Sequence, residues 1–299
     1  KKLISFILFP LALLPPYFAY LISKTISRVI FLLDLRVVQT IDINITHCFP
    51  NMNTADKEIL VVESLTETIF LLFEFSYLTN LPTRRLLAMI ADIEGKALLH
   101  DAIVENRGVL LLTPHFGNFE ALEVYLGNNY SFSALYKPPK IKLLEELVSE
   151  TRERHGGKMY PTSYSGLKSI LQDLRNGGLI AILPDQVPNE NQGAINSSFF
   201  GTPVRYMSLA HNLIRKTNPM VIFASVERVF KNKKLTYKLT LEEAPADIYN
   251  ADPLIHARAL AVSIEKIVIA APAQYQWEYK IFKRSLAPGV NENDFYRRQ

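Results

Sequence analysis

The sequence predicts an α/β fold: a layered domain with a central mixed β-sheet flanked by helices. The first observation is that strand-like apolar runs such as "VLLLT" and "LIAIL" alternate along the chain with stretches of helical periodicity. The second is "KLTYKLTLEE", in which polar and apolar residues alternate as on an exposed edge strand. At 299 residues, the chain can bury a sizeable core as one large domain or two small ones.

The elements of the first half follow from capping residues and periodicity. Asn53 and Thr54 are good N-cap residues, which predicts a helix to about Leu78, and Pro82 fits the first turn of another helix. The later elements are a helix to Asn106, the strand "VLLLT", a helix from about Asn118, the strand "FSALYK" and a helix over 141–154.

The second half continues the alternation. A helix over 165–176 is closed by two glycines, and the buried-looking strand "LIAIL" follows it. A loop through Pro203 is expected next. A helix over 207–216, the strand "MVIFASV", the alternating strand "KLTYKLTLEE" and a helix after Pro253 complete the domain.

The N-terminus is the clearest shift in composition, because residues 3–23 carry no charge and lysines flank them. About 20 apolar residues suffice to span a bilayer. Pro10, Pro15 and Pro16 argue against one regular helix, so a kinked span and an in-plane anchor both stay open, and a buried hydrophobic helix is the alternative. We therefore expect an N-terminal hydrophobic membrane-anchoring helix in residues 1–24, followed by the α/β domain in residues 25–299.

Composition excludes several other classes. The single cysteine, Cys48, excludes an internal disulfide and a cysteine-rich zinc site. A net charge of +4 suits an anionic surface better than a nucleic-acid groove, so no nucleic acid is expected as a partner. The six histidines lack metal-ligand spacing, and the common nucleotide-binding and serine-hydrolase motifs are missing, so neither a metal nor a cofactor is expected.

His115 and Glu120 lie where the strand "VLLLT" runs into a helix. Five positions apart, they would differ by about 140° on one helix, so the pair can cooperate only if the histidine precedes the helix. Pro114 and Gly117 supply that break, and Asn118 can cap a helix with Glu120 in its first turn. A carboxylate there can fix the imidazole tautomer and leave the other nitrogen as a base, with an ordinary pKa of about 6.5. The alternative is a loop histidine with a capping glutamate.

This segment resembles the H-x4-D/E block of the glycerolipid acyltransferase superfamily. "HFGNFE" is most similar to the block of the lipid A late acyltransferases of Gram-negative bacteria, and the resemblance covers roughly residues 1–285. Two departures are Phe119, where the family often has tryptophan, and Ile281, where arginine is common. The further blocks are "YKPPK" at 136–140, "RERHGG" at 152–157, "LPDQ" at 183–186, "FFGTP" at 199–203 and "QYQWEYKIFK" at 274–283.

The resemblance implies that residues 25–299 form an acyltransferase domain, which transfers a fatty acyl chain from acyl carrier protein to a lipid A precursor. The acceptor would be a hydroxyl of a 3-hydroxyacyl chain on that precursor. The resemblance also implies a location at the bacterial inner membrane, with the catalytic domain on the cytoplasmic side. Donor, acceptor and membrane are therefore the expected partners.

The candidate site residues divide by role. His115 and Glu120 are the expected acid–base pair, and one of Arg152 and Arg154 is expected to place positive charge near them, because residues two apart face about 200° apart on a helix. For each arginine, a solvated charge at a helix end is the alternative. A solvated charge is likewise the alternative for Lys137, a turn residue for Asp185, and core positions for Phe199 and Phe200. The substrate-binding candidates are Gly117, Asn118, Lys137, Arg154, Asp185, Phe199 and Phe200, with Arg152 placed in the catalytic set.

Two other functions stay open at this point. An acyltransferase that uses acyl-CoA and acts on another glycolipid or a lysophospholipid would carry the same H-x4-E block. The second alternative is not an enzyme: it is a membrane-anchored lipid-binding protein in which the His/Glu pair is vestigial.

Overall fold

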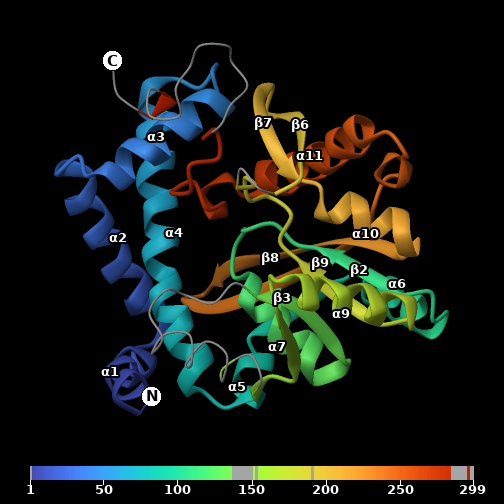
Figure 1. Cartoon of the computed structure of the whole chain (residues 1–299). Helices are drawn as coiled ribbons and strands as arrows, with labels where there is room; N and C mark the ends of the chain where they lie inside the picture. Colours follow the sequence, from blue (N-terminus) through green and yellow to red (C-terminus); the bar gives the residue numbers. More distant parts are fainter. Residues whose placement is uncertain (1, 137–150, 152–153, 190–191, 284–294, 297–299) are drawn as a thin grey trace. The chain divides into compact units, whose positions relative to one another are not determined.

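A computed structural model of the chain describes residues 2–136, 151, 154–189, 192–283 and 295–296 (Figure 1). The chain divides into two compact units, each built from three separate segments. The first unit comprises residues 1–19, 71–183 and 213–244, and the second comprises residues 20–70, 184–212 and 245–299.

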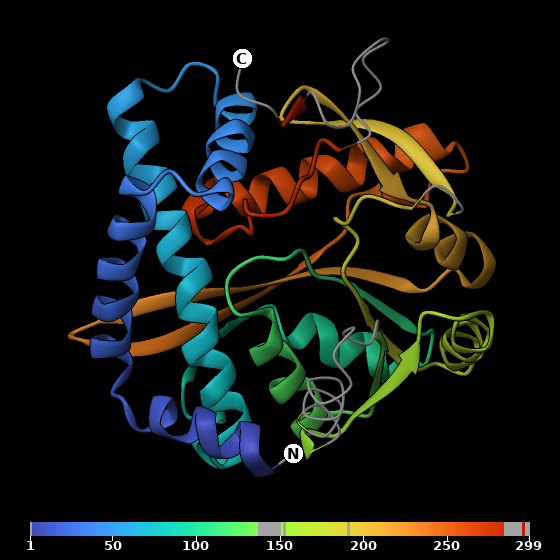
Figure 2. The same ribbon diagram turned by 60° about the vertical axis from the view of Figure 1, so that its left-hand side comes forward.

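The first unit contains a seven-stranded mixed sheet with the strand order β1-β9-β8-β2-β5-β3-β4. All neighbours are parallel except β8 and β9, which form the long antiparallel pair drawn in orange in Figures 1 and 2. The strands are β1 (Ile90–Glu94), β2 (Val109–Leu112), β3 (Phe132–Tyr136), β4 (Gly157–Pro161), β5 (Leu179–Ile182), β8 (Met220–Lys231) and β9 (Lys234–Glu243).

The centre of this sheet is its most apolar part. Every residue of β2 and of β5 is buried, and their continuous apolar sequences are typical of parallel strands covered on both faces. Because β2 is parallel to both β5 and β8, their carboxyl ends meet at one edge of the sheet. In parallel α/β sheets this edge is where ligands usually bind, and the segment with His115 leaves β2 there.

Helices pack on the sheet through their apolar faces. Helix α6 contacts β2 and β9, α7 contacts β4 and β8, and α9 contacts β3, β4 and β5. The helices of this unit are α1 (Lys2–Leu13), α5 (Thr83–Leu87), α6 (Lys96–Val104), α7 (Phe119–Asn129) and α9 (Tyr164–Arg175), while α2 (Pro16–Leu32), α4 (Thr54–Asn80) and α10 (Leu209–Thr217) each have residues in both units.

The second unit has a β-hairpin packed on a long helix. Strands β6 (Ala194–Phe199) and β7 (Thr202–Met207) are joined by a two-residue turn, and β6 packs against α11 (Pro253–Ala270). Its buried core includes Cys48, Tyr206 and Trp277. The remaining elements are α3 (Arg36–Cys48) and two short 3-10 helices, η1 (Ala246–Tyr249) and η2 (Pro272–Gln274).

Two sequence predictions about strands are wrong. The alternating strand "KLTYKLTLEE" is β9, which lies between β1 and β8 and is not an edge strand. Alternation reports that one face of a strand is buried and says nothing about which hydrogen-bonding edges are occupied. The loop expected through Pro203 is the β6–β7 hairpin, whose turn residues Phe200 and Gly201 both have positive φ, as a tight hairpin turn requires.

The apolar N-terminal segment forms two helices. Helix α1 ends at Leu13, and α2 begins at Pro16, a residue suited to a first helical turn. Among the residues that the structure describes, no helix has both the length and the apolar composition needed to cross a membrane. The expected membrane-anchoring helix over residues 1–24 is therefore not supported by the fold.

Buried histidines should make the stability of the protein depend on pH. His256 is fully buried, its Nδ1 lies 2.7 Å from the Ile248 carbonyl oxygen, and within the described residues its Nε2 has no hydrogen-bond partner. Burial lowers the pKa of His256, and burial likewise lowers the pKa of His155. Below about pH 6.5, the unfolded chain therefore binds protons that the folded protein does not.

We expect the free energy of unfolding to fall as the pH decreases below about 6.5, by up to about 1.4 kcal/mol per pH unit for each such histidine. His256→Gln removes one of these groups and should make the decrease less steep. His100→Gln, at an exposed position of α6, is the control and should keep the wild-type slope. Denaturant unfolding between pH 5 and pH 7 measures the slopes, and equal slopes in all three proteins would contradict the expectation.

Candidate active site

The segment from β2 to α7 has the local structure that its sequence predicts. β2 ends at Leu112, Gly117 has a φ of 56°, and α7 begins at Phe119. Asn118 is the N-cap of α7, and its side-chain oxygen accepts a hydrogen bond of 3.3 Å from the Ala121 N–H. Glu120 therefore lies in the first helical turn and His115 precedes the helix.

The two candidate side chains, His115 and Glu120, are more exposed than the residues of the turn between them. Phe116, Gly117 and Asn118 are buried, whereas His115 and Glu120 are half-buried. The His115 ring packs edge-on against Phe119, with 5.3 Å between the ring centroids. The aromatic position where the resembling family often has tryptophan thus contacts the candidate base directly.

The backbone N–H groups of this turn have different partners. The Phe116 N–H donates to the Pro114 carbonyl at 2.7 Å, and the Asn118 N–H donates to the Val226 carbonyl of β8 at 3.1 Å. Neither the Gly117 N–H nor the Phe119 N–H has a backbone acceptor among the described residues. These two groups at the N-terminus of α7 are suited to bind a developing negative charge.

A buried polar network lies directly beneath the turn, and sequence analysis missed its main members. Glu74 of α4 pairs with Arg228 of β8, and Arg228 also donates to the Gly117 carbonyl. The Tyr237 hydroxyl of β9 joins Glu74 to Asn118. The available signal was weak: one charge inside the apolar run "LLFEF" and an adjacent Glu–Arg pair inside "VERVF".

Arg154 and His155 of the "RERHGG" block contact the C-terminal end of α4. Arg154 donates to the carbonyl oxygens of Leu78 and of Thr79, the latter at 2.9 Å, where a cation is favoured by the helix dipole. His155 is buried, and its Nε2 lies 3.3 Å from the Leu78 carbonyl oxygen. Burial lowers the pKa of His155, while the negative charge of Glu120 acts in the opposite direction. The block is thus within electrostatic range of Glu120.

Helix α7 also touches this block through backbone atoms. The Gly127 Cα faces the His155 carbonyl oxygen so closely that a Cβ on residue 127 would overlap it. Gly156, with a φ of 87°, in turn faces the Gly127 carbonyl. His155 and Gly156 of the block therefore pack closely against α7.

The other predicted site residues fall elsewhere. Lys137 and Arg152 lie outside the described residues, as does almost all of the helix expected over 141–154. Asp185, Phe199 and Phe200 belong to the second unit.

Within the second unit, these residues lie close to a buried aromatic cluster. Asp185 is buried and hydrogen-bonded to Tyr275; burial and the Asp185 charge raise the pKa of that tyrosine. Phe199 is buried, with its ring centroid 5.7 Å from that of Tyr275. The Phe200 N–H donates to a Glu265 carboxylate oxygen at 2.7 Å. Phe199 is thus a core residue of its unit.

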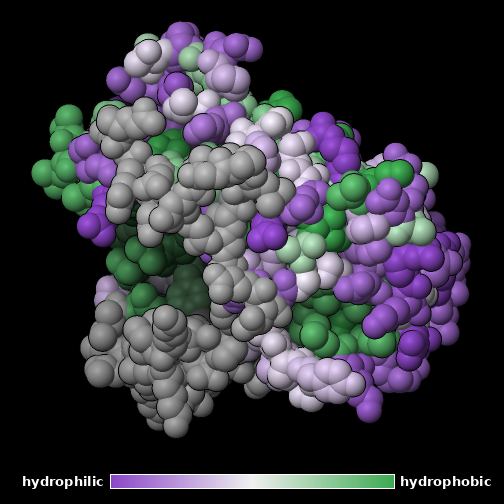
Figure 3. All heavy atoms as spheres, turned by 45° about the horizontal axis from the view of Figure 1, so that its top comes forward, coloured by the Kyte–Doolittle hydropathy of each residue, from purple (hydrophilic) through white to green (hydrophobic). Residues whose placement is uncertain are grey.

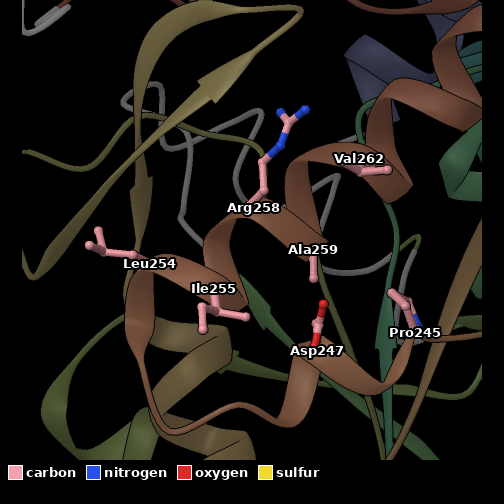
Figure 4. Close-up of a pocket in the computed structure, with 7 residues that line it drawn as sticks. All are labelled: Pro245, Asp247, Leu254, Ile255, Arg258, Ala259 and Val262. Atoms are coloured by element: carbon pink, nitrogen blue, oxygen red, sulfur yellow. The ribbon is translucent and has the colours of Figure 1, made fainter.

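A separate hollow lies beside α11 in the second unit (Figure 4). Its lining is mostly apolar and includes none of the predicted site residues. Within the described part of the chain, no group of three or more His, Cys, Asp or Glu residues is placed to hold a metal ion. The residues that line the hollow are Pro245, Asp247, Leu254, Ile255, Arg258, Ala259 and Val262.

Comparison with known proteins gives one consistent family. The family described as "Bacterial lipid A biosynthesis acyltransferase" matches residues 2–284. The chain is 25% identical over 241 residues to a lipid A biosynthesis acyltransferase of Haemophilus influenzae, which covers 80% of this chain and 74% of the relative. It is 23% identical over 279 residues to the lipid A biosynthesis myristoyltransferase of Escherichia coli, which covers 91% of this chain and 83% of the relative.

The contact between Gly127 and the 155–156 turn gives a test of the packing. In an unhindered helix, Gly→Ala stabilises by up to about 1 kcal/mol. We expect Gly127→Ala to destabilise the protein instead, by about 1–3 kcal/mol, because the added methyl group must push backbone aside. Asn128→Ala, at the exposed neighbouring position of α7, is the control and should be neutral or slightly stabilising. If denaturant unfolding shows that Gly127→Ala is stabilising, the close contact is wrong.

Proposed function

Because this chain belongs to the bacterial lipid A biosynthesis acyltransferase family, we propose that it transfers a fatty acyl chain from acyl carrier protein to a 3-hydroxyacyl hydroxyl of a lipid A precursor. Family membership establishes an acyltransferase of lipid A biosynthesis. The donor, the acceptor hydroxyl and the residue roles are our proposal. The observation that carries them is the placement of His115 before α7 and of Glu120 in its first turn, at the carboxyl edge of the sheet.

In the proposed reaction, His115 acts as the general base. A secondary alcohol is a poor nucleophile, so the imidazole takes the hydroxyl proton as the oxygen attacks the thioester carbonyl carbon. A C–O bond forms and the carbonyl π electrons move to oxygen. The tetrahedral intermediate then collapses, the C–S bond breaks, and the imidazolium returns its proton to the leaving thiolate. Glu120 holds the imidazole in the required tautomer.

The tetrahedral oxyanion needs donors placed in advance. The Gly117 and Phe119 N–H groups, at the positive end of the α7 dipole, are suited to this role. Arg154 donates to the carbonyl end of α4, which assigns it to holding the "RERHGG" block near the dyad. We therefore propose Arg152 as the arginine that adds positive charge near the substrate.

We also propose that α2 binds the cytoplasmic face of the inner membrane, where the lipid acceptor resides. Phe18, Ile22, Ile26 and Val29 recur every three or four residues, which places them on one face of α2, and each is 39–58% exposed. Helix α2 contains no acidic residue, and its basic residues suit an anionic lipid surface. Figure 3 shows apolar side chains at the left-hand edge of the molecule, where α2 lies in Figure 1.

The dyad is tested with purified protein, acyl carrier protein thioester and a lipid A precursor, with acyl-CoA as a parallel donor. His115→Ala and Glu120→Ala should each lower kcat by about 10²- to 10⁴-fold while the protein stays folded, as expected for lost acid–base assistance. His100→Ala, at an exposed histidine, is the control and should keep wild-type turnover. Folded dyad variants with wild-type kcat would refute the assignment, and transfer from acyl-CoA alone would refute the donor.

The membrane role is tested by vesicle sedimentation. Replacing Phe18, Ile22 and Ile26 together by serine should lower binding to phosphatidylethanolamine/phosphatidylglycerol vesicles by at least about tenfold, because each apolar side chain contributes on the order of 2 kcal/mol when buried. The control is a triple serine variant at exposed apolar positions of α11, which should bind like wild type. Equal binding of both variants would show that another surface makes the contact. The control positions are Leu254, Val262 and Ile269.

A further inference from the structure

We propose that Glu74, Arg228 and Tyr237 are positioning residues for acyl transfer, because their buried network fixes the turn between His115 and Glu120. The inference rests on the proposed function of that pair. None of the three positioning residues is required to touch substrate.

Arg228 fixes one peptide plane of the turn. Its guanidinium pairs with Glu74 at 2.7 Å and donates to the Gly117 carbonyl at 2.9 Å. The N–H on the other side of the same peptide, that of Asn118, donates to the Val226 carbonyl of β8 at 3.1 Å. Because a peptide unit is planar, these two contacts from one strand set its orientation. That orientation also directs the neighbouring Gly117 and Phe119 N–H groups.

Tyr237 extends the same network into the first turn of α7. Its hydroxyl donates to the second Glu74 oxygen at 2.9 Å and accepts from the Asn118 side-chain amide at 3.0 Å. The oxygen of that amide accepts from the Ala121 N–H, next to Glu120. Burial and the Glu74 charge raise the pKa of Tyr237 well above its ordinary value, so the hydroxyl stays protonated. The network thus reaches the chain on both sides of the helix start.

The energetics of the pair favour a positioning role over a purely stabilising one. The side chains of Glu74 and Arg228 are only 1% and 2% exposed. Removing two charges from water offsets most of their attraction, and apolar replacements of buried ion pairs are often equally stable. Further hydrogen bonds of this pair are directed at Gly117 and, through Tyr237, at Asn118. The ion pair therefore contributes mainly by fixing the geometry of the turn at Gly117 and Asn118.

Tyr237→Phe is the first test, because it removes one hydroxyl and keeps the ring. A displacement of about 1 Å can lower a rate about 100-fold, so we expect kcat to fall by about 10- to 100-fold with little change in the KM of the acyl donor. Tyr160→Phe is the matched control, since Tyr160 also donates to a carboxylate, that of Asp173, at 3.0 Å. Tyr160 lies on β4, three strands away from β2, and its variant should keep wild-type kcat.

The double variant Glu74→Leu/Arg228→Met separates positioning from folding. Replacing both charges leaves neither member of this ion pair without its partner, so the double variant should be less destabilised than either single variant. We expect its kcat to be lowered by at least about tenfold, because the Gly117 carbonyl has lost its donor. A purely structural pair would give a folded double variant with wild-type kcat.

The pH dependence of kcat/KM gives a second test, because a loss of protein stability alone would not shift the apparent pKa of the base. A carboxylate held beside an imidazole favours its charged form, so loosening Glu120 should lower the apparent pKa of the base. The acid limb of the profile should then shift to lower pH in Tyr237→Phe and stay in place in Tyr160→Phe.

Folded Tyr237→Phe and double variants with wild-type kcat and an unshifted acid limb would overturn the positioning role, as would an equal loss in Tyr160→Phe. If the double variant does not fold, Tyr237→Phe decides alone. The variants His115→Ala and Glu120→Ala test the proposed function separately. Wild-type turnover in those two variants would refute the catalytic role of His115 and Glu120, whereas lowered turnover in them would leave only the positioning role in question.

Discussion

The Gly117–Asn118 peptide is the constraint on which the rest of the site depends. Its carbonyl is held by Arg228 and its N–H by Val226, both on β8. Gly117 can adopt the left-handed φ of 56° that places these two groups, and Asn118 then caps α7. His115 precedes this peptide and Glu120 follows it, so the orientation of this peptide sets the course of the chain between the two residues.

The sequence predicted the local part of this arrangement because its determinants are close together in the chain. A fully apolar strand, a glycine, an N-cap asparagine and an acidic first turn lie within a dozen residues, and each acts through contacts a few positions away. The helices at 54–80 and 164–175 also depend on local contacts, because the side chains of Asn53 and Ser163 cap their first turns.

The parts that sequence did not predict depend on distant pairings. Glu74 meets Arg228 across 154 positions and Tyr237 across 163, and no spacing rule connects them. The hairpin at 194–207 was missed because its strands contain serine, asparagine and proline, which weaken the apolar signal. The position of β9 inside the sheet depends on β1, a short half-exposed strand with little pattern of its own.

The approach of Gly127 to the 155–156 turn has a mechanical consequence. Two backbones in direct contact have no side chain between them whose rotamer could absorb a displacement. The turn and α7 must therefore shift as one body, and Glu120 at the other end of α7 shifts with them. The contact of Gly127 with His155 and Gly156 therefore acts as a rigid coupling, and replacing Gly156 would change the position of a carboxylate that lies about 10 Å along the helix.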